Sequence, residues 1–565
     1  MHHRKDMNSC DFIIVGAGSA GCVLANRLSE DPGNSVLLLE AGGHEHRHWR
    51  MKMPLAWRDT FMDPRLSWSY MSEPEPHADN RRIPAPRGRV VGGSSSVNGM
   101  MYSRGHPSDY DHWRDLGLPG WSYAEVLPYF RRAEANWRGE SIYHGTHGPL
   151  TVARHVPDPR LYPRLIATAQ RLGYRHLEDF HGDEVEGFST PDFNVHRGRR
   201  ASTAARYLRP VMGRQNLTVV ASALARRLLF EQHRAIGVEY EQHGQLRQVY
   251  AEREVIIAAG TFNSPQLLLL SGIGPARELE AAQVTPLHDL PGVGKNLQDH
   301  QSVGAVYLAR GPITFESQLR LDRLMLSVLR WQLLGTGPVA GLPVAAQGFL
   351  KLRPESPGVD VQFLISPVSM AARAWFPGVR KGAGHVFSMA NVVLHPESRG
   401  EVTLRSKDPR DPPRIQFNLL QAPADRATLR AGLRFVRKFF ATAPAADLVQ
   451  QELMPGAAIE SDADLDAHIR RSAGTAMHPT STCAMGADAM AVVDAQLRVR
   501  GIAALRVVDA SVMPLIVGGN TNAPVIMIAE KAADMILRRA ALPPARLGTA
   551  AIRTSHVAAA LSAGR

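Results

Sequence analysis

The sequence of 565 residues predicts an α/β fold, α+β overall, with a parallel sheet at its centre. Short apolar runs typical of buried parallel strands occur at 12–15, 36–39, 254–259 and 505–508. Long insertions separate the later runs from the first two. These observations predict one discontinuous sheet domain, into which a second domain is inserted.

The first two runs belong to a βαβ unit. Phe12–Val15 leads directly into the glycine-rich segment 16–21, and the residues up to Leu28 continue with helical spacing. A turn at 31–34 precedes the second run, which ends at Glu40. Strand, glycines, helix, strand and acidic residue within about 30 residues indicate a Rossmann-type unit that binds a dinucleotide. A glycine-rich turn in a protein without a nucleotide is the less favoured interpretation.

Each residue of this turn has a mechanical reason. Gly16 permits the tight turn, Gly18 lets the backbone approach a pyrophosphate, and Gly21 allows close packing of helix and strand. The helix that begins near Ser19 offers unpaired N–H groups and a positive dipole end to the phosphates. Glu40 closes the second strand, where its carboxylate can accept hydrogen bonds from ribose hydroxyls.

The later runs divide the chain into two predicted domains. The nucleotide-binding domain is expected at 9–157, 198–308 and 475–540, and the inserted substrate-binding domain at 158–197 and 309–474. Strand patterning at 359–365 and 400–404 predicts a mainly antiparallel sheet with helices in the second domain. The tail at 541–565 is rich in Ala, Arg and Ser and is expected to be disordered.

Further motifs follow in order along the chain. They are Gly88–Asn98 (GRVVGGSSSVN), Gly260–Gln266 running on to Ser271–Gly274, Gly292–His300, and His478-Pro479 with Gly519–Pro524 (GNTNAP). Together with the N-terminal unit, these motifs resemble those of the glucose–methanol–choline (GMC) oxidoreductases, a family of FAD-dependent alcohol dehydrogenases and oxidases. The resemblance runs from Asp11 to Leu537, nearly the whole chain.

The resemblance implies FAD as the cofactor. Gly92-Gly93 followed by three serines forms a flexible, donor-rich loop, which the resemblance places beside the flavin ring. Some family members bond the flavin covalently through a histidine in this loop, and the corresponding residue here is Val97. Valine has no nucleophile, so we predict non-covalent FAD. The expected FAD contacts are Gly16, Gly18, Ser19, Gly21, Glu40, Arg89, Val91, Gly93, Ser94, Asn98, Gly99, Val220, Asp509, Ala510 and Asn520.

His478 and Asn522 are the predicted catalytic residues. Oxidation of an alcohol requires a group that takes the hydroxyl proton while hydride leaves the carbon, and imidazole suits this role because its pKa is near neutrality. The resemblance assigns this role to His478 and implies that Asn522 touches the same substrate oxygen. An amide cannot act as a base, so Asn522 would orient the substrate. A helix is predicted at 523–531, and its N-terminus would stabilise the reduced flavin.

The predicted reaction is FAD-dependent oxidation of a primary alcohol to its aldehyde, with hydride passing to flavin N5. The electrons then pass to a quinone-like or other carrier, with oxygen as the alternative acceptor. The resemblance leaves three other functions open: an oxygen-using alcohol oxidase, a choline dehydrogenase and a flavin-containing hydroxynitrile lyase. For choline, the sequence identifies no carboxylate that would hold the cationic head.

Composition argues against several other classes. The formal charge of +12 comes from basic residues scattered along the chain, which disfavours nucleic acid as a partner. No apolar run approaches the roughly 18 residues of a membrane span, and the first ten residues contain no apolar segment of a secretion signal. The three cysteines show no metal-site or disulfide spacing, so no metal and a cytoplasmic location are predicted. The oligomeric state is left open.

Two groups of residues have competing interpretations. The segment 320–334 carries three arginines among apolar residues, and packing inside the substrate-binding domain is favoured over a basic amphipathic helix lying on a membrane. Peripheral membrane contact therefore stays as the alternative. The second group is expected to be solvated rather than to anchor a substrate, and it consists of Arg81, Arg82, Arg197, Arg199 and Arg200.

Overall fold

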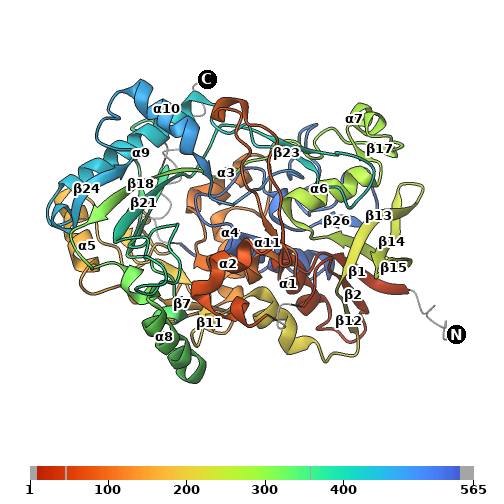
Figure 1. Ribbon diagram of the computed structural model, residues 1–565. Helices are drawn as coiled ribbons and strands as arrows, with labels where there is room; N and C mark the ends of the chain where they lie inside the picture. Colours follow the sequence, from red (N-terminus) through yellow and green to blue (C-terminus); the bar gives the residue numbers. More distant parts are fainter. Residues whose placement is uncertain (1–8, 45–47, 357, 548–565) are drawn as a thin grey trace.

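The computed structural model describes residues 9–44, 48–356 and 358–547. Two seven-stranded sheets form the cores of two adjoining halves (Figure 1). Neither half is continuous in sequence, because the strands of each sheet come from distant parts of the chain. The predicted fold class, a Rossmann-type domain with an inserted second domain, is confirmed.

The first sheet has the order β12-β2-β1-β15-β14-β13, and β26 pairs with β15. Its strands are β1 (Ser9–Val15), β2 (Val36–Leu39), β12 (Leu217–Val220), β13 (Ala223–Glu231), β14 (Arg234–Gln242), β15 (Gln245–Ile257) and β26 (Leu505–Val507). All of the apolar runs that predicted this sheet overlap these strands.

Strand β15 is long enough to serve several neighbours. Its first half pairs with β14 in antiparallel register, and its second half pairs in parallel with both β1 and β26, so that Ile256 lies opposite Ile14 and Arg506. Strands β2 and β12 continue the parallel part. The carboxyl ends of β1, β2, β15 and β26 therefore meet at one edge, which is where doubly wound sheets bind ligands.

Helices α1 (Ser19–Leu28) and α11 (Asn522–Ile536) pack against each other beside this sheet. Nearly every residue of α11 is buried, and its Glu530 accepts hydrogen bonds from Arg27 of α1 and from Arg132. The predicted helix at 523–531 is thereby confirmed. The other helices of this half are α3 (Pro107–Asp115), α4 (Tyr123–Ala133), α6 (Gly260–Leu270) and α7 (Ala276–Ala281).

The second sheet has the order β24-β18-β21-β20-β19-β8, with β25 beside β18, and its pairs are antiparallel. Its strands are β8 (Gly187–Ser189), β18 (Gln301–Ala309), β19 (Ala346–Leu350), β20 (Val361–Ser366), β21 (Val386–Val393), β24 (Val449–Met454) and β25 (Gly474–Thr475). Since β18 begins at Gln301, most of this strand lies before the boundary expected at residue 308.

Helix α9 (Pro423–Ala441) covers the second sheet. Its buried residues Leu429, Leu433, Val436 and Phe440 recur every three or four positions and face β18 and β21. The remaining helices are α2 (Trp57–Phe61), α5 (Tyr162–Arg171), α8 (Leu321–Leu334) and α10 (Asp462–Ser472).

Short strands complete the described fold. A four-stranded sheet contains β5 (Met101–Tyr102), β9 (Asp192–Phe193), β7 (Leu150–Arg154) and β6 (Glu134–Asn136). Two-stranded pairs are β3 (Ser67–Trp68) with β4 (Arg87–Gly88), β10 (Val195–His196) with β11 (Arg199–Arg200), β16 (Ile273–Gly274) with β17 (His288–Asp289), and β22 (Glu401–Thr403) with β23 (Arg414–Gln416).

Packing of α8 inside the substrate-binding domain, the favoured interpretation of its sequence, is wrong. Within this helix only Ser327 and Trp331 are buried, whereas Met325, Leu326 and Leu333 are 70%, 68% and 73% exposed. Figure 1 shows α8 projecting at the lower left, away from both sheets. Apolar residues lie on all sides of this helix, but only the side of Ser327 and Trp331 has protein neighbours to pack against. No helix in the described ranges is long and apolar enough to cross a membrane.

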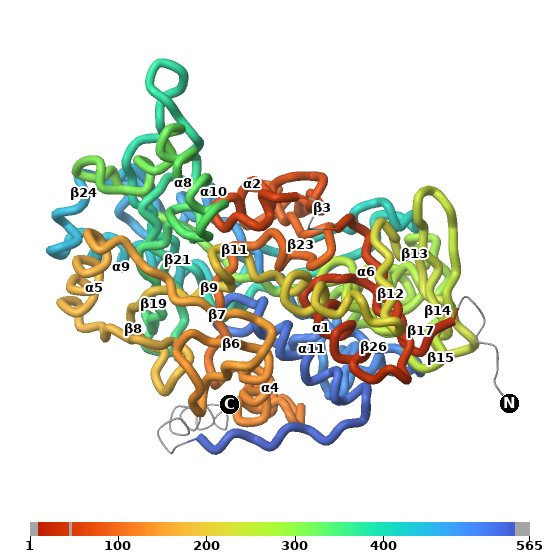
Figure 2. Tube along the Cα trace, turned by 90° about the horizontal axis from the view of Figure 1, so that it is seen from below, coloured from red at the N-terminus to blue at the C-terminus, as the bar shows by residue number. Residues whose placement is uncertain are grey.

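The end of the described chain follows helix α4. Leu542 N donates to Tyr129 Oη at 3.2 Å and Ala545 N donates to Ala124 O at 2.8 Å. Figure 2 shows this blue segment running beneath α4. Residues 541–547 are thus placed by contacts with α4, and the rest of the tail expected to be disordered lies outside the described residues.

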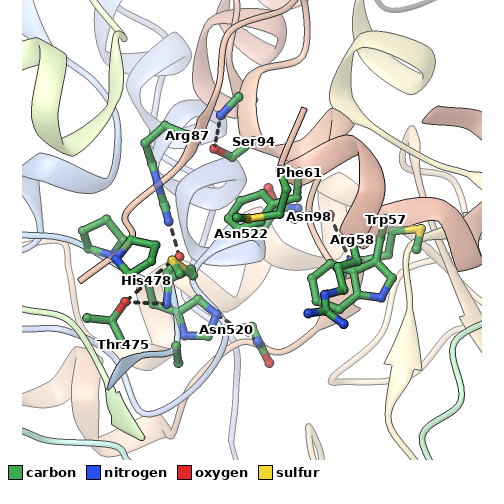
Figure 3. Close-up of a pocket in the computed structure, with 18 of the residues that line it drawn as sticks. Trp57, Arg58, Phe61, Arg87, Ser94, Asn98, Thr475, His478, Asn520 and Asn522 are labelled. Atoms are coloured by element: carbon green, nitrogen blue, oxygen red, sulfur yellow. Dashed lines mark hydrogen bonds between the residues drawn. The ribbon is translucent and has the colours of Figure 1, made fainter. Parts of the chain in front are cut away.

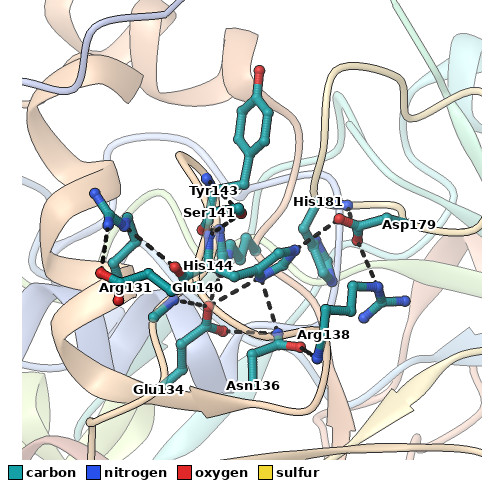
Figure 4. Close-up of polar contacts among 12 residues, drawn as sticks. Arg131, Glu134, Asn136, Arg138, Glu140, Ser141, Tyr143, His144, Asp179 and His181 are labelled. Carbon is teal, nitrogen blue, oxygen red and sulfur yellow. Dashed lines mark hydrogen bonds and ion pairs between the residues drawn. The ribbon is translucent and has the colours of Figure 1, made fainter.

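A buried polar network joins β6 to the loop that precedes β8 (Figure 4). The Glu134 carboxylate accepts from Arg104 Nη2 at 2.6 Å and lies 3.1 Å from His144 Nδ1, while His144 Nε2 is 2.7 Å from Asp179. Burial raises the pKa of Glu134, but Arg104 and His144 outweigh it and hold that pKa at about 2. The buried carboxylate of Glu134 is therefore fully paired with cationic and hydrogen-bonding groups.

Candidate functional site

A cavity of about 1120 Å³ lies between the two sheets. Its walls come from the loop after β1, the carboxyl ends of β2 and β15, strands β18, β20 and β21, and the segment 474–479. Most of the predicted site residues line it: Gly16, Gly18, Ser19, Glu40, Gly93, Ser94, Asn98, Gly99, His478, Asp509, Ala510, Asn520 and Asn522. Side chains and loops from distant parts of the sequence thus meet in one space.

The other predicted FAD contacts lie outside the cavity wall, and they are Gly21, Arg89, Val91 and Val220. A Cβ atom on Gly21 would be 1.9 Å from Gly16 O, so Gly21 serves the close packing of α1 against the turn. The Arg89 guanidinium lies 4.3 Å from the centre of the Trp68 ring. Gly21 and Arg89 therefore pack against residues of the cavity wall without lining the cavity themselves.

Glycines form a narrow cradle at one end of the cavity. Gly16 has a φ of +100°, and a Cβ there would be 2.5 Å from Ala258 O. A Cβ on Gly93 would be 2.7 Å from the Cα of Gly18. Backbone alone therefore lines this end, beside the first turn of α1, whose N–H groups and dipole favour phosphate. The cradle fits the pyrophosphate of FAD.

Glu40 lies beside the cradle. Its carboxylate accepts hydrogen bonds from Ala17 N at 2.9 Å and Gly42 N at 2.8 Å. Burial nevertheless raises the pKa of Glu40 to about 7. Each carboxylate oxygen has a second lone pair, which suits the ribose hydroxyls expected here.

The loop after β4 is held by a buried arginine. Arg200 donates to Asn98 O at 2.6 Å and to Asn98 Oδ1 at 2.9 Å. Asn98 Oδ1 also accepts from Met100 N at 2.9 Å. Burial lowers the pKa of Arg200 to about 9. Arg200 was expected to be solvated, and this expectation is wrong, because the backbone carbonyls of the flavin-side loop need a donor.

His478 lies across the cavity from this loop. Its backbone N donates to Asp299 Oδ1 at 2.8 Å, and the preceding Met477 has a φ of +65°. Desolvation, aided by the positive charge of Arg87, lowers the pKa of His478 to about 3. The imidazole is therefore neutral near pH 7 and available as a proton acceptor.

A second histidine determines which nitrogen of His478 carries the proton. His300 Nε2 is 3.0 Å from Val517 O, which can only accept, so this nitrogen carries hydrogen. Burial lowers the pKa of His300 well below its usual value, so the ring is neutral and its Nδ1 is an acceptor. That Nδ1 is 3.0 Å from His478 Nδ1, which must then donate. His478 Nε2 is left with its lone pair.

Asn520, rather than Asn522, reaches that lone pair. Asn520 Nδ2 lies 3.0 Å from His478 Nε2, whereas Asn522 Oδ1 accepts a hydrogen bond from Ser19 Oγ at 2.8 Å. Figure 3 shows His478 and Asn520 together at one end, with Trp57 and Arg58 on the opposite side. The structure thus places Asn520, which was predicted as an FAD contact, beside His478. It places Asn522, which was predicted as the catalytic partner, beside the glycine cradle.

Sequence reasoning missed three residues around His478. Asp299 is buried, which raises its pKa to about 7 against the opposing charge of Arg87. Arg87 donates to Met477 O at 3.0 Å, and burial lowers its pKa to about 10. Asp299 and His300 end the motif Gly292–His300, which the sequence singled out without giving either residue a role. Nothing in the sequence around Arg87 indicated its role.

Charged groups are few on the cavity wall. Among the described residues that line it, the acidic ones are Glu40, Asp59 and Asp509, and the basic ones are Arg58, Arg87 and Arg373. Glu40 lies at the cradle, and Asp509 accepts from Gly260 N, Ser264 Oγ and Ser511. Within those described ranges, no group of three or more His, Cys, Asp or Glu side chains is arranged to hold a metal ion.

The glycine cradle, the donor-rich loop and the neutral histidine define a flavoenzyme that acts on CH–OH groups. The family models for GMC oxidoreductases match residues 10–302 and 396–529, so the chain belongs to the GMC oxidoreductase family. It is an FAD-dependent oxidoreductase of alcohols.

Curated relatives match this chain over nearly its whole length. Mitochondrial choline dehydrogenase of Mus musculus is 44% identical over 539 residues, which cover 94% of this chain and 90% of the relative. An oxygen-dependent choline dehydrogenase of Photobacterium profundum is 43% identical over 543 residues, 95% of each chain. The recognition of the family from sequence motifs is confirmed.

Solved structures agree with the fold. Pyridoxine 4-oxidase from Mesorbium loti has a TM-score of 0.84 and 33% identity, covering 94% of this chain and 100% of its own. Formate oxidase from Aspergillus oryzae has a TM-score of 0.87 and 28% identity, covering 94% and 99%. Both superpose over the two halves together.

Proposed function

We propose that this protein oxidises an uncharged primary alcohol to its aldehyde, with His478 as the base and Asn520 as the group that holds the substrate oxygen. The single observation that supports this is the hydrogen-bonded line from Val517 O through His300 to His478. It leaves the Nε2 lone pair of His478 directed at Asn520 and the cavity. Bound FAD supplies the hydride acceptor.

The chain's own part of the reaction is proton transfer and orientation. His478 Nε2 takes the hydroxyl proton, because its lowered pKa keeps it unprotonated before substrate arrives. The Asn520 amide then donates to the developing alkoxide instead of to Nε2. The Nδ1–H of His478 keeps its bond to His300, so the protonated ring does not rotate. The proposed pair is His478–Asn520, in place of the expected His478–Asn522.

We propose that FAD is held without a covalent bond. Val97, at the position where some family members carry the linking histidine, is fully buried in an apolar cluster with Met51, Phe61, Leu66 and Val90. It has no nucleophilic atom. Acid denaturation should release free flavin into the supernatant, and flavin that stays with the polypeptide would overturn this part of the proposal.

The choice of an uncharged substrate rests on the wall charges. A quaternary ammonium head is held by carboxylates or aromatic faces. Across the cavity from His478, where Arg58 lies, the described wall has one exposed carboxylate, Asp59, beside the arginines Arg58 and Arg373. Those cations repel a cationic head, and Arg58 lies beside Trp57, whose ring is an aromatic face of this wall.

Choline is the second candidate, favoured by the names of the relatives. One experiment separates the two: anaerobic reduction of the bound flavin by choline and by neohexyl alcohol, in which carbon replaces the quaternary nitrogen. We expect the neutral alcohol to have the higher kcat/KM. A higher value for choline would select the second candidate. Bleaching by neither, nor by other alcohols, would favour a hydroxynitrile lyase, in which the flavin stays oxidised.

The proposal also covers the electron acceptor and the location of the protein in the cell. We propose a quinone-like carrier in preference to oxygen, and a cytoplasmic protein. Reoxidation of the reduced flavin measured with a soluble quinone and with oxygen tests the first point. Faster reoxidation by oxygen would make the protein an oxidase.

A further inference from the structure

Helix α8 and the loop 369–381 form one apolar surface, called here the α8 surface. Its members are all exposed by 39% to 82%. They are Leu321, Met325, Leu326, Leu329, Leu333 and Leu334 of the helix, and Met370, Phe376 and Val379 of the loop. This many exposed apolar side chains on one helix and the loop bound to it mark an interaction site.

The α8 surface is held in place and is not a poorly packed segment. Leu321 N donates to Trp375 O at 2.8 Å, and Trp375 N donates to Leu319 O at 3.1 Å, which ties the loop to the helix. On the opposite side of the helix, Trp331 is 1% exposed and donates to Gly198 O at 2.6 Å. The helix therefore presents its apolar side outward while its other side is anchored.

Basic residues accompany this apolar surface. The segments 320–334 and 369–381 contain six basic residues and one acidic residue, Asp322. Asp322 pairs with Arg320 at 2.6 Å. The other five basic side chains have no carboxylate partner in the described part of the chain, and they are Arg323, Arg330, Arg373, Arg380 and Lys381. The surface is thus apolar with a positive rim.

The α8 surface also borders the cavity. Leu324 of the helix and Met370 and Arg373 of the loop belong to the cavity wall. A partner that covers the surface would therefore lie beside the cavity.

We propose that the α8 surface binds peripherally to a bilayer containing anionic phospholipids, with α8 lying in the interface and its leucines among the acyl chains. An exposed apolar helix face with basic residues at its edge can bind in this way. A second copy of the chain is the poorer occupant, because two such surfaces would place five unpaired cations against five. The inference does not depend on the proposed substrate, because it concerns binding and not turnover.

The test is co-sedimentation of the holoenzyme with vesicles. One set contains phosphatidylcholine alone, and the other contains one part in four of phosphatidylglycerol. We expect binding to the anionic vesicles that weakens as salt is added. We expect the triple variant Met325→Gln, Leu329→Gln, Leu333→Gln to have a vesicle partition coefficient lower by at least about tenfold. We expect Arg323→Gln with Arg330→Gln to reduce the preference for anionic lipid, because Arg373, Arg380 and Lys381 remain.

Leu246→Gln is the matched control, since Leu246 is 61% exposed but lies on the first sheet. Control and triple variant should keep FAD, thermal unfolding and oxidation of a soluble alcohol unchanged. Wild-type protein that stays in the supernatant would overturn the proposal, and so would a triple variant that binds as well as wild type. A dimer that the triple variant dissociates, without any vesicle binding, would identify a second copy as the occupant and overturn it too.

Discussion

Ser19 Oγ donates a 2.8 Å hydrogen bond to Asn522 Oδ1, and this bond ties the first turn of α1 to the first turn of α11. Asn520, two residues earlier and outside the helix, contacts His478 instead. Two asparagines of one short motif therefore serve different parts of the cavity, one the glycine cradle and one the base.

Replacement of each asparagine should separate these roles. Asn520→Ala removes the donor to the substrate oxygen, so we expect flavin reduction by alcohol to slow by on the order of 10²-fold, with FAD retained. Asn522→Ala removes a neutral hydrogen bond worth about 1 kcal/mol, so it should loosen FAD and change the reduction rate little. Stopped-flow reduction and flavin titration measure the two effects. The reverse pattern would restore Asn522 as the catalytic partner.

Loss of the base should affect chemistry and spare the cofactor. His478→Ala is expected to lower the rate of flavin reduction by about 10²- to 10⁴-fold, because it removes the proposed acceptor of the hydroxyl proton. Its flavin absorbance spectrum should stay that of bound FAD. A variant that reduces its flavin at the wild-type rate would refute the assignment.

His300 should act on the reaction through His478. His300→Phe leaves the Nδ1–H of His478 without an acceptor, so the ring can turn and present N–H to the substrate. We expect kcat to fall with little change in KM, and the pH profile of the remaining activity to move. His300→Gln, which keeps an acceptor and a donor, should recover part of the rate. Equal losses in both variants would assign His300 a packing role only.

The pH dependence of flavin reduction should lack the inflection of an ordinary histidine. A free imidazole gains its proton near pH 6.5, but the lowered pKa of His478, about 3, keeps its lone pair available well below that. Reduction should therefore not decline as the pH falls from about 7 to about 5. The carboxyl groups of Glu40 and Asp299, with pKa values of about 7, also titrate in this range. A loss of kcat/KM centred near pH 6.5 that persists in both Glu40→Gln and Asp299→Asn would show that the base has an unshifted pKa.

The polar network around Glu134 should matter for stability. Glu134→Gln leaves Arg104 and His144 without their buried carboxylate and should cost about 3–5 kcal/mol in the free energy of unfolding. Glu140→Gln is the control, because Glu140 is 64% exposed and lies 3.5 Å from Arg131. Its cost should stay within about 0.5 kcal/mol. Denaturant unfolding of both variants measures this.

The same carboxylate also gives a pH effect with a definite sign. Its pKa in the folded protein is about 2, below the unfolded value of about 4.3. The stabilisation is present above pH 4.3 and is lost as the pH falls toward 2. Glu134→Gln should flatten this part of the acid unfolding curve, and a curve unchanged in shape would contradict the pairing.

The fold was predictable because its signals are local. The apolar runs and the turn at Gly16, Gly18 and Gly21 each indicate their structure within a few residues. The strands lie where these runs predicted them. The different roles of Asn520 and Asn522 are not determined by the nearby sequence. It depends on α11 beginning at Asn522, so that one side chain faces α1 while the other stays in the loop before the helix.

The burial of individual side chains could not be predicted from the sequence. Arg200 looks like its neighbour Arg199, but only Arg200 is enclosed, because the carbonyls of Ser95 and Asn98 face it. In α8, apolar residues with three arginines among them favoured packing inside the substrate-binding domain. Only the three-dimensional neighbours decide which side of such a helix meets protein.

The strand order of the first sheet has a consequence for biosynthesis. The glycine loop after β1 leaves the ribosome early, whereas β26 and α11, its neighbours at the cradle, are translated after the entire inserted half. A nascent chain therefore carries an open cradle through most of its translation. Contacts so distant in sequence form slowly, so cofactor capture awaits the final segments and favours full-length chains over truncated ones.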